Sequence, residues 1–183
     1  MALRAAALIS LLWLRQAAPA LAASSHVAVP TVQTTSLAGE QVVLPSALHG
    51  RLGVLVFGFT RASRAGVTSW GKRLARDYSQ SPTTTYYEVA MLAAVPRFAR
   101  GLVERGMRSS MPTAVQAHFL IFSDDEPTWR SLVRYTTPDD PYILLIDPQG
   151  QVLWRTHGEA TPSAYADLQH QLQQHAQNTG GTR

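Results

Sequence analysis

Three short, uninterrupted apolar runs constrain the fold of this chain more than any other feature. They lie within residues 54–60 (VLVFGFT), 117–123 (AHFLIFS) and 142–146 (YILLI). Each run has the length of a strand, and a strand without polar alternation is typical of a sheet that is covered on both faces. Segments with helical spacing of apolar residues lie between the runs. The chain therefore predicts a sheet with helices packed against both of its faces.

Two of the helical segments are rich in arginine. The first spans residues 66–78 and has apolar side chains on one face. The second begins at Pro96, and there Phe98, Leu102 and Val103 form an apolar stripe opposite a row of arginines. We expect both to be amphipathic helices that pack on the core and turn their arginines to solvent. For the second helix, contact of the basic face with anionic lipid or a membrane protein is the alternative.

The expected order of elements is β, β, α, β, α, β, α, β, β, α. The last two strands are joined by a turn at DPQG, residues 147–150, and the last helix has Thr161 as its N-cap and Pro162 as its first residue. A closing hairpin followed by a helix points to a thioredoxin-like fold. We predict a three-layer α/β/α domain with a central mixed sheet.

The beginning of the chain resembles an export signal. The first 39 residues contain no Asp or Glu, and the apolar run AAALISLLWL is followed by small residues at Ala20 and Ala22. This layout predicts a secretory signal peptide and an extracytoplasmic protein, periplasmic or secreted; an uncleaved anchor and a mitochondrial presequence are the alternatives. We expect the signal peptide over 1–22, a linker or edge segment over 23–36, the thioredoxin-like domain over 37–176 and a disordered tail over 177–183.

Charge and cysteine content exclude several functions. The formal net charge is +4, but Arg4 and Arg15 belong to the leader, which leaves 14 basic against 12 acidic residues and no case for nucleic acid as a partner. The chain has no cysteine, which excludes thiol–disulfide exchange and thiolate metal sites. The six histidines show no metal-ligand spacing. We expect no metal and no cofactor.

One stretch resembles a known redox loop. VLVFGFTRASRAG is similar to the strand and active loop of the copper-delivery proteins of cytochrome oxidase assembly and of their redoxin relatives. Their F-G-F-T pattern is matched by residues 57–60. The first cysteine of the family falls on Ala62 and the second on Gly66. The resemblance therefore implies the redoxin fold, without copper ligands and without the thiol pair.

A longer stretch, residues 111–172, resembles the C-terminal half of the mitochondrial ATP-synthase Fo-sector assembly factor, which is itself thioredoxin-like. The earlier dipeptide Ser69-Trp70 also matches, whereas Pro141 stands where that family tends to have glycine. The resemblance implies an assembly role and a protein partner. The matching residues are Phe119, Leu132, Tyr142, Leu145, Asp147, Trp154, Arg155, Gly158, Ala160 and Thr161.

The loop after the strand at 54–60 is the candidate binding site. It runs into a helix N-terminus, where backbone N–H groups favour an anion, and Arg61 and Arg64 would strengthen such a site. A small anion is therefore a candidate ligand, and a polar loop with solvated arginines is the alternative. Ser63 lacks the sequence setting of a catalytic nucleophile. The candidate binding residues are Thr60, Arg61, Ala62, Ser63, Arg64 and Gly66.

Two further surfaces are candidates. The resemblance to thioredoxin-like proteins implies that Pro141 is a cis proline facing the loop; a trans proline that begins a terminal strand is the alternative. A basic surface is expected to meet a partner. Its candidate residues are Arg97, Arg100, Arg105, Arg108 and Arg155.

These features lead to two hypotheses of different class. The first is a cysteine-free, non-redox thioredoxin-like binding protein, a chaperone or assembly factor for a membrane or respiratory complex, with a membrane-associated protein partner. The second is an enzyme of redoxin ancestry with a non-thiol activity at the helix N-terminal loop. The absence of a nucleophile, acid and base set favours the first.

Overall fold

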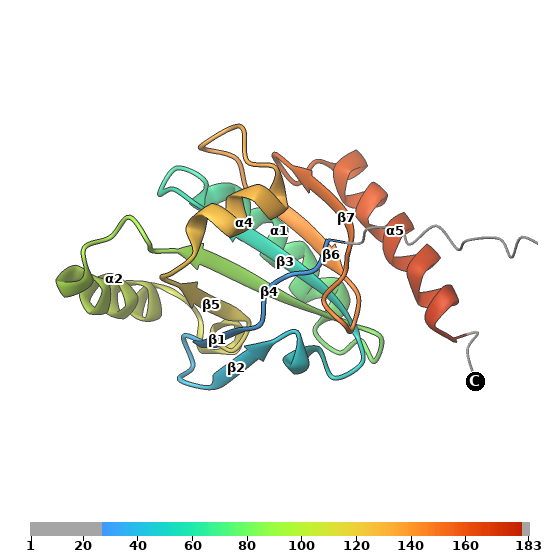
Figure 1. The fold of residues 1–183 in the computed structure, drawn as a ribbon, viewed down its shortest axis with the longest axis horizontal. Coiled ribbons are helices and arrows are strands. Elements are labelled where there is room, and N and C mark those ends of the chain that lie inside the picture. Colours follow the sequence, from blue (N-terminus) through green and yellow to red (C-terminus); the bar gives the residue numbers. More distant parts are fainter. Residues whose placement is uncertain (1–26, 181–183) are drawn as a thin grey trace, which may run out of the picture.

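A five-stranded mixed sheet forms the centre of the molecule (Figure 1). A computed structural model describes residues 27–180, and the structural statements below concern this part of the chain. The strands are β3 (Leu52–Gly58), β4 (Thr84–Met91), β5 (Phe119–Phe122), β6 (Tyr142–Ile146) and β7 (Val152–His157). Their order across the sheet is β5-β4-β3-β6-β7. The pairs β3/β4 and β4/β5 are parallel, and the pairs β3/β6 and β6/β7 are antiparallel.

Helices lie on both faces of this sheet. α1 (Arg64–Tyr78) and α5 (Pro162–Gly180) pack on one face, and α4 (Glu126–Val133) packs on the other. α2 (Arg97–Ser110) and the short α3 (Thr113–Gln116) connect β4 to β5. Figure 1 shows α2 at the end of the molecule opposite α5. The predicted three-layer α/β/α arrangement with a mixed sheet is confirmed.

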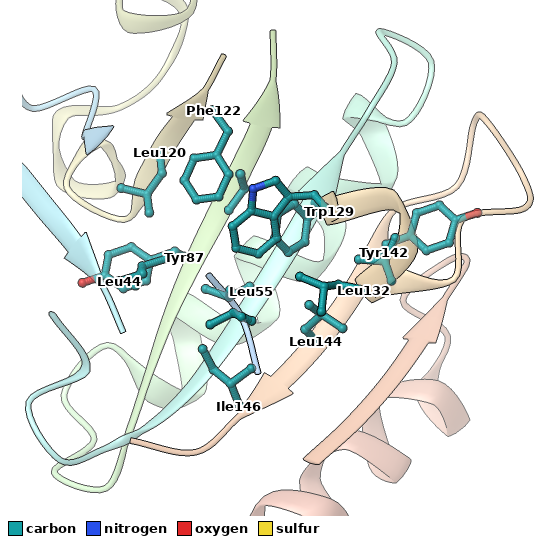
Figure 2. Packing of buried hydrophobic residues seen from close by; sticks show 14 of the residues in the cluster. Leu44, Leu55, Tyr87, Leu120, Phe122, Trp129, Leu132, Tyr142, Leu144 and Ile146 are labelled. Atoms are coloured by element: carbon teal, nitrogen blue, oxygen red, sulfur yellow. The ribbon is translucent and has the colours of Figure 1, made fainter. Parts of the chain in front are cut away.

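The alternation of side chains along β3 divides the core in two. Val54 and Val56 face α1 and α5, whereas Leu55 and Phe57 face α4. On the α4 side, the Trp129 ring lies against the Phe57 ring, with 5.1 Å between the ring centroids. It also lies against the Phe122 ring of β5, at 4.9 Å between centroids (Figure 2). Both faces of β3 are therefore buried, which explains why its sequence is an unbroken apolar run.

A small N-terminal hairpin covers one edge of the main sheet. It consists of β1 (Val32–Thr35) and β2 (Gln41–Leu44), which pair antiparallel. The Thr34 hydroxyl donates to the Ile121 carbonyl of β5, and the Leu37 N–H donates to the Phe119 carbonyl at 2.9 Å. Residues 32–35 of the predicted linker or edge segment form β1 of this hairpin. A 3-10 helix, η1 (Ser46–Leu48), leads from this hairpin into β3.

The predicted disordered tail is wrong in its first part. α5 continues to Gly180, so residues 177–180 are helical. No proline follows Pro162, and the good helix formers Ala, Gln and Leu dominate the segment, so nothing ends the helix earlier. Residues 181–183, the predicted signal peptide at 1–22 and residues 23–26 lie outside the described part of the chain.

Candidate functional site

The loop between β3 and α1 is closed by a reciprocal pair of hydrogen bonds. The Ser63 hydroxyl donates to the Thr60 carbonyl at 2.8 Å, and the Ser63 N–H donates to the Thr60 hydroxyl oxygen at 3.3 Å. Ser63 is only 1% exposed. Its hydroxyl is therefore committed to the loop backbone, and the structure gives no support to a nucleophilic role.

The two arginines of the loop have different settings. Arg64 donates from its guanidinium to the Ser110 hydroxyl, at 3.1 Å, and so links the start of α1 to the end of α2. Arg61 and Ala62 are exposed at the tip of the loop. The Arg64 N–H is also used, because it donates to the Arg61 carbonyl at 3.3 Å. Arg64 is thus engaged elsewhere, and the anion site expected at this helix N-terminus is left with Arg61 alone.

Gly66 packs directly against Pro141. A Cβ atom at position 66 would lie 2.7 Å from Pro141 Cγ, so only glycine fits there without a shift. This contact places Pro141 beside the loop, as the sequence predicts. A cysteine at position 66 would meet the same ring. At position 66, where the redoxin loop has its second cysteine, this chain therefore has no sulfur, and the Pro141 ring occupies the space that a side chain would need.

The prediction of a cis bond before Pro141 is wrong. Among the described residues the cis peptide bond is Leu44–Pro45, and the Asp140–Pro141 bond is trans. Trans is the ordinary preference of X–Pro bonds by about 0.5–1 kcal/mol. In this trans form the Pro141 ring contacts the first turn of α1.

Gly158 joins three parts of the site. Its N–H donates to the Pro141 carbonyl at 3.0 Å, and its carbonyl accepts from Trp70 Nε1 at 2.9 Å. Its φ of +98° is in the region that favours glycine. Because Trp70 belongs to α1 and is fully buried, these bonds fix the segment before α5 against both α1 and the start of β6.

A surface hollow of about 440 Å³ lies between α1 and the segment before α5. Ala65, Gly66 and Ser69 form the α1 wall, and residues 159–162 form the opposite wall. Most of these side chains are small, and Glu159 is the only charged one among them. We call this hollow, together with the adjoining loop 60–66 and Pro141, the α1 groove. The sequence signals SW, Pro141 and GEATP, which are far apart in the chain, meet there.

A side-chain hydrogen bond beside the α1 groove was missed by sequence reasoning. His157 Nδ1 lies 2.7 Å from Asp140 Oδ2, and the His157 ring stacks on the Tyr142 ring at 5.3 Å between centroids. Position 157 is paired with position 142 in the β6/β7 register. That cross-strand neighbour follows only once the hairpin register is known, so the sequence alone offers no signal for it.

Three arginines of the predicted partner surface have a structural role within the chain. Arg155 donates to the Leu132 carbonyl at 2.7 Å, Arg100 donates to the Val95 carbonyl at 3.0 Å, and Arg108 donates to the Leu37 carbonyl at 2.7 Å. Burial and the neighbouring Arg134 lower the pKa of Arg155. Each of these three charges is thus bonded to a backbone carbonyl of the chain, and contact with a partner at these residues stays a prediction. Arg97 and Arg105 are exposed.

A buried carboxyl lies beneath α1, and sequence reasoning also missed it. Glu88 of β4 is 6% exposed, and burial raises its pKa from 4.5 to about 7. A side chain at Gly71 of α1 would overlap Glu88 Oε1. The single acid in the apolar-rich segment TTYYEVAML is the signal that could have revealed it.

The sheet order, the helices on both faces and the loop beside Pro141 define a thioredoxin-like fold, here with a loop that contains no cysteine. Solved structures share this fold. An exposed lipoprotein thioredoxin of Streptococcus pneumoniae has a TM-score of 0.55 at 12% identity, covering 78% of this chain and 98% of its own. A putative thiol:disulfide interchange protein DsbE of Chlorobium tepidum has a TM-score of 0.55 at 19% identity, with 82% and 96% covered.

A third similar structure is BsSco, a member of the Sco family of cytochrome c oxidase assembly proteins. Its TM-score is 0.55 at 15% identity, with 84% of this chain and 95% of BsSco covered. At these identities the likeness concerns the fold. No protein-family model and no curated protein matches the chain. The redoxin resemblance is thus confirmed at the level of the fold, and the resemblance to the Fo-sector assembly factor stays a prediction.

Proposed function

We propose that this chain is a non-redox, thioredoxin-like binding protein that holds a segment of a protein partner in the α1 groove. The observation that carries the proposal is the groove itself: Pro141, Gly158 and Trp70 hold its walls together by short contacts, although the loop has no cysteine. Because this groove has no thiol to react, binding a partner is the simplest function for it.

The side chains of the groove indicate what could bind. Glu159 lies on one wall, and the Ser69 and Thr161 hydroxyls lie on the two walls. Arg61 is exposed at the tip of the adjoining loop. Hydroxyls, one carboxylate and one guanidinium around small side chains suit a polar peptide segment better than an apolar ligand.

The similar structures support an assembly role outside the cytoplasm. BsSco belongs to a family of assembly proteins, and the S. pneumoniae protein is an exposed lipoprotein. We extend these properties to this chain as part of the proposal. The chain would act as a chaperone or assembly factor for a membrane or respiratory complex, and its partner would be membrane-associated.

Site-specific photo-crosslinking in the native cell tests the proposal. The crosslinking residue is placed at Ser69, which is exposed and lines the hollow, and a matched one is placed at Lys72, which is exposed on the same helix and does not line it. Ser63 is unsuitable because it is buried. We expect Ser69 to give a discrete protein adduct, identified by mass spectrometry, and Lys72 to give none.

A pair of substitutions distinguishes groove binding from general stickiness. Ala65→Trp fills the hollow, whereas Thr68→Trp adds the same ring to an exposed position of α1 that does not line it. We expect the Ser69 adduct to disappear with Ala65→Trp and to persist with Thr68→Trp. An adduct that survives Ala65→Trp, or one that forms equally at Lys72, would refute binding in the α1 groove.

A further inference from the structure

The largest exposed apolar side chains of residues 27–180 lie on one face of α2. Phe98 is 92% exposed and Leu102 is 73% exposed, and no residue of this helix is buried. The two residues are four positions apart, so their side chains are neighbours on the helix surface. Val27, at 48%, is the other large apolar residue that is exposed in this part of the chain. The predicted apolar stripe thus faces outward at Phe98 and Leu102, and the expectation that it packs on the core is wrong for them.

Polar contacts explain why α2 has this orientation. Its inner side is held by the bonds of Arg100 to the Val95 carbonyl and of Arg108 to the Leu37 carbonyl. Gln116 donates to the Arg108 carbonyl at 3.0 Å and so ties the end of the helix to α3. Glu104 and Arg108 line a hollow of about 200 Å³ between α2 and the N-terminal hairpin. The helix is therefore anchored by its charged side, and its apolar side is left uncovered.

The charges around the apolar pair are all positive. Arg105 lies three positions after Leu102 and seven after Phe98, so it is their neighbour on this face, whereas Arg97 lies at the start of the helix, at the border of the face; both are exposed. Within residues 27–180 neither side chain has a hydrogen bond or an ion pair with another residue. The single acidic residue of the helix, Glu104, is half-buried beside the inner hollow. The outer face therefore combines two apolar side chains with the free guanidinium group of Arg105, and the free guanidinium group of Arg97 lies at its border.

We propose that the outer face of α2 is a docking surface for an anionic lipid bilayer. Phe98 and Leu102 would enter the boundary between headgroups and acyl chains, and Arg97 and Arg105 would contact lipid phosphates. Among residues 27–180 no helix is long and apolar enough to cross a membrane, so this contact lies on the membrane surface. The position of α2 at one end of the molecule lets it reach a flat surface (Figure 1).

Charge and shape favour lipid over the other occupants of this face. A second copy of the chain would bring two pairs of free arginines together, which is repulsive. A protein would need a matching concavity and about 1,000 Å² of buried surface, whereas a bilayer deforms around two protruding side chains. The surface is separate from the α1 groove, so the inference does not depend on the proposed function.

A fluorescent label on α2 of the full chain tests the inference. Since the chain has no cysteine, Gly106→Cys gives a single labelling position, one turn after Leu102, where a Cβ atom meets nothing within 4 Å. An environment-sensitive fluorophore there reports the surroundings of α2 itself, so an apolar leader that binds lipid elsewhere does not produce the signal. Lys72→Cys on α1 is the matched control label. We expect a blue shift at position 106 with equimolar phosphatidylglycerol and phosphatidylcholine vesicles, and no shift with phosphatidylcholine alone.

Paired variants then identify the side chains responsible. Phe98→Ser with Leu102→Ser should raise the lipid concentration for half-maximal shift by roughly tenfold or more. Arg97→Gln with Arg105→Gln should raise it by about tenfold at low salt and remove most of its salt dependence. Two controls should leave the lipid concentration for half-maximal shift unchanged. Val27→Ser removes an exposed apolar residue elsewhere, and the double variant Lys72→Gln with Arg134→Gln removes two charges elsewhere.

Several results would overturn the inference. One is a label at position 106 that does not respond to anionic vesicles, or a response that the α2 variants leave intact. A shift that appears on raising protein concentration without lipid would assign the face to a second copy. A shift seen only with native membranes that retain their proteins, and not with pure lipid, would assign it to a protein partner.

Discussion

Helices α1 and α2 have similar sequence patterns, but α1 packs its apolar face on the core and α2 exposes its apolar face. They have 15 and 14 residues, both are amphipathic, and both carry several arginines. α1 buries Val67, Trp70, Gly71 and Leu74, whereas α2 buries nothing and turns Phe98 and Leu102 to solvent. An amphipathic pattern therefore shows that a helix has an apolar face, and it does not show what covers that face.

The largest expected difference between the two helices is in stability. Trp70→Ala removes a fully buried ring and its hydrogen bond to the Gly158 carbonyl, so we expect it to lower the free energy of unfolding by about 3–5 kcal/mol. Phe98→Ala removes a ring that is 92% exposed and should change it by less than about 0.5 kcal/mol. Urea denaturation measures both. A cost above about 1 kcal/mol for Phe98→Ala would mean that the α2 face is covered within the chain.

The second difference is pH dependence, since α1 covers a carboxyl whose folded-state pKa is about 7, against 4.5 ordinarily. Between about pH 4.5 and 7 the unfolded chain loses this proton while the folded chain keeps it. The free energy of unfolding therefore falls as pH rises through this window, by up to about 3 kcal/mol. Glu88→Gln should raise stability by up to that amount near pH 8 and change it little near pH 4.5.

Thermal unfolding at the two pH values checks this expectation. The matched control is Glu104→Gln on α2, where the carboxyl is half-buried and α2 covers no core. We expect Glu104→Gln to shift the free energy of unfolding by less than about 0.5 kcal/mol at both pH values. Equal effects of Glu88→Gln at the two pH values would contradict the raised pKa of Glu88.

The sequence predicts most of the fold because its strongest signals are local. The unbroken run in β3 and the Thr161-Pro162 start of α5 each depend on burial or capping within a few residues, and Ala164 N–H does donate to the Thr161 hydroxyl at 3.1 Å. The closeness of Pro141 to the loop is also predicted. The orientation of α2 is not, because it is set by Arg108 reaching a carbonyl 71 positions away.

In the candidate site, too, features that depend on local sequence are predicted, and features that depend on residues far apart in the chain are not. The loop residues are found from their position between a strand and a helix. The Asp140–His157 pair depends on a cross-strand register, and the burial of Glu88 depends on a glycine of another element. Ser63 and Arg155 look available in the sequence because their hydrogen-bond acceptors, backbone carbonyls, leave no mark on it.

The smallest expected effects on the free energy of unfolding come from replacing one glycine in each helix by alanine. Gly66→Ala in α1 places a Cβ atom 2.7 Å from Pro141 Cγ, so we expect a loss of about 1–2 kcal/mol in the free energy of unfolding after the gain in helix propensity is counted. Gly101→Ala in α2 meets nothing within 4 Å, so only the propensity gain remains, up to about 1 kcal/mol. The two changes should therefore have opposite signs in the same denaturation assay.

The sign at position 66 also decides whether the loop can accommodate a thiol pair. If Gly66→Ala destabilises, a cysteine at that position would strain the contact with Pro141, and Ala62→Cys with Gly66→Cys would rebuild the thiol pair only at a cost in stability. If Gly66→Ala is neutral or stabilising, the proline can shift, and a thiol pair would fit in this loop without loss of stability. A destabilising Gly66→Ala would mean that the packing of Pro141 on position 66 leaves no space for a cysteine in the α1 groove.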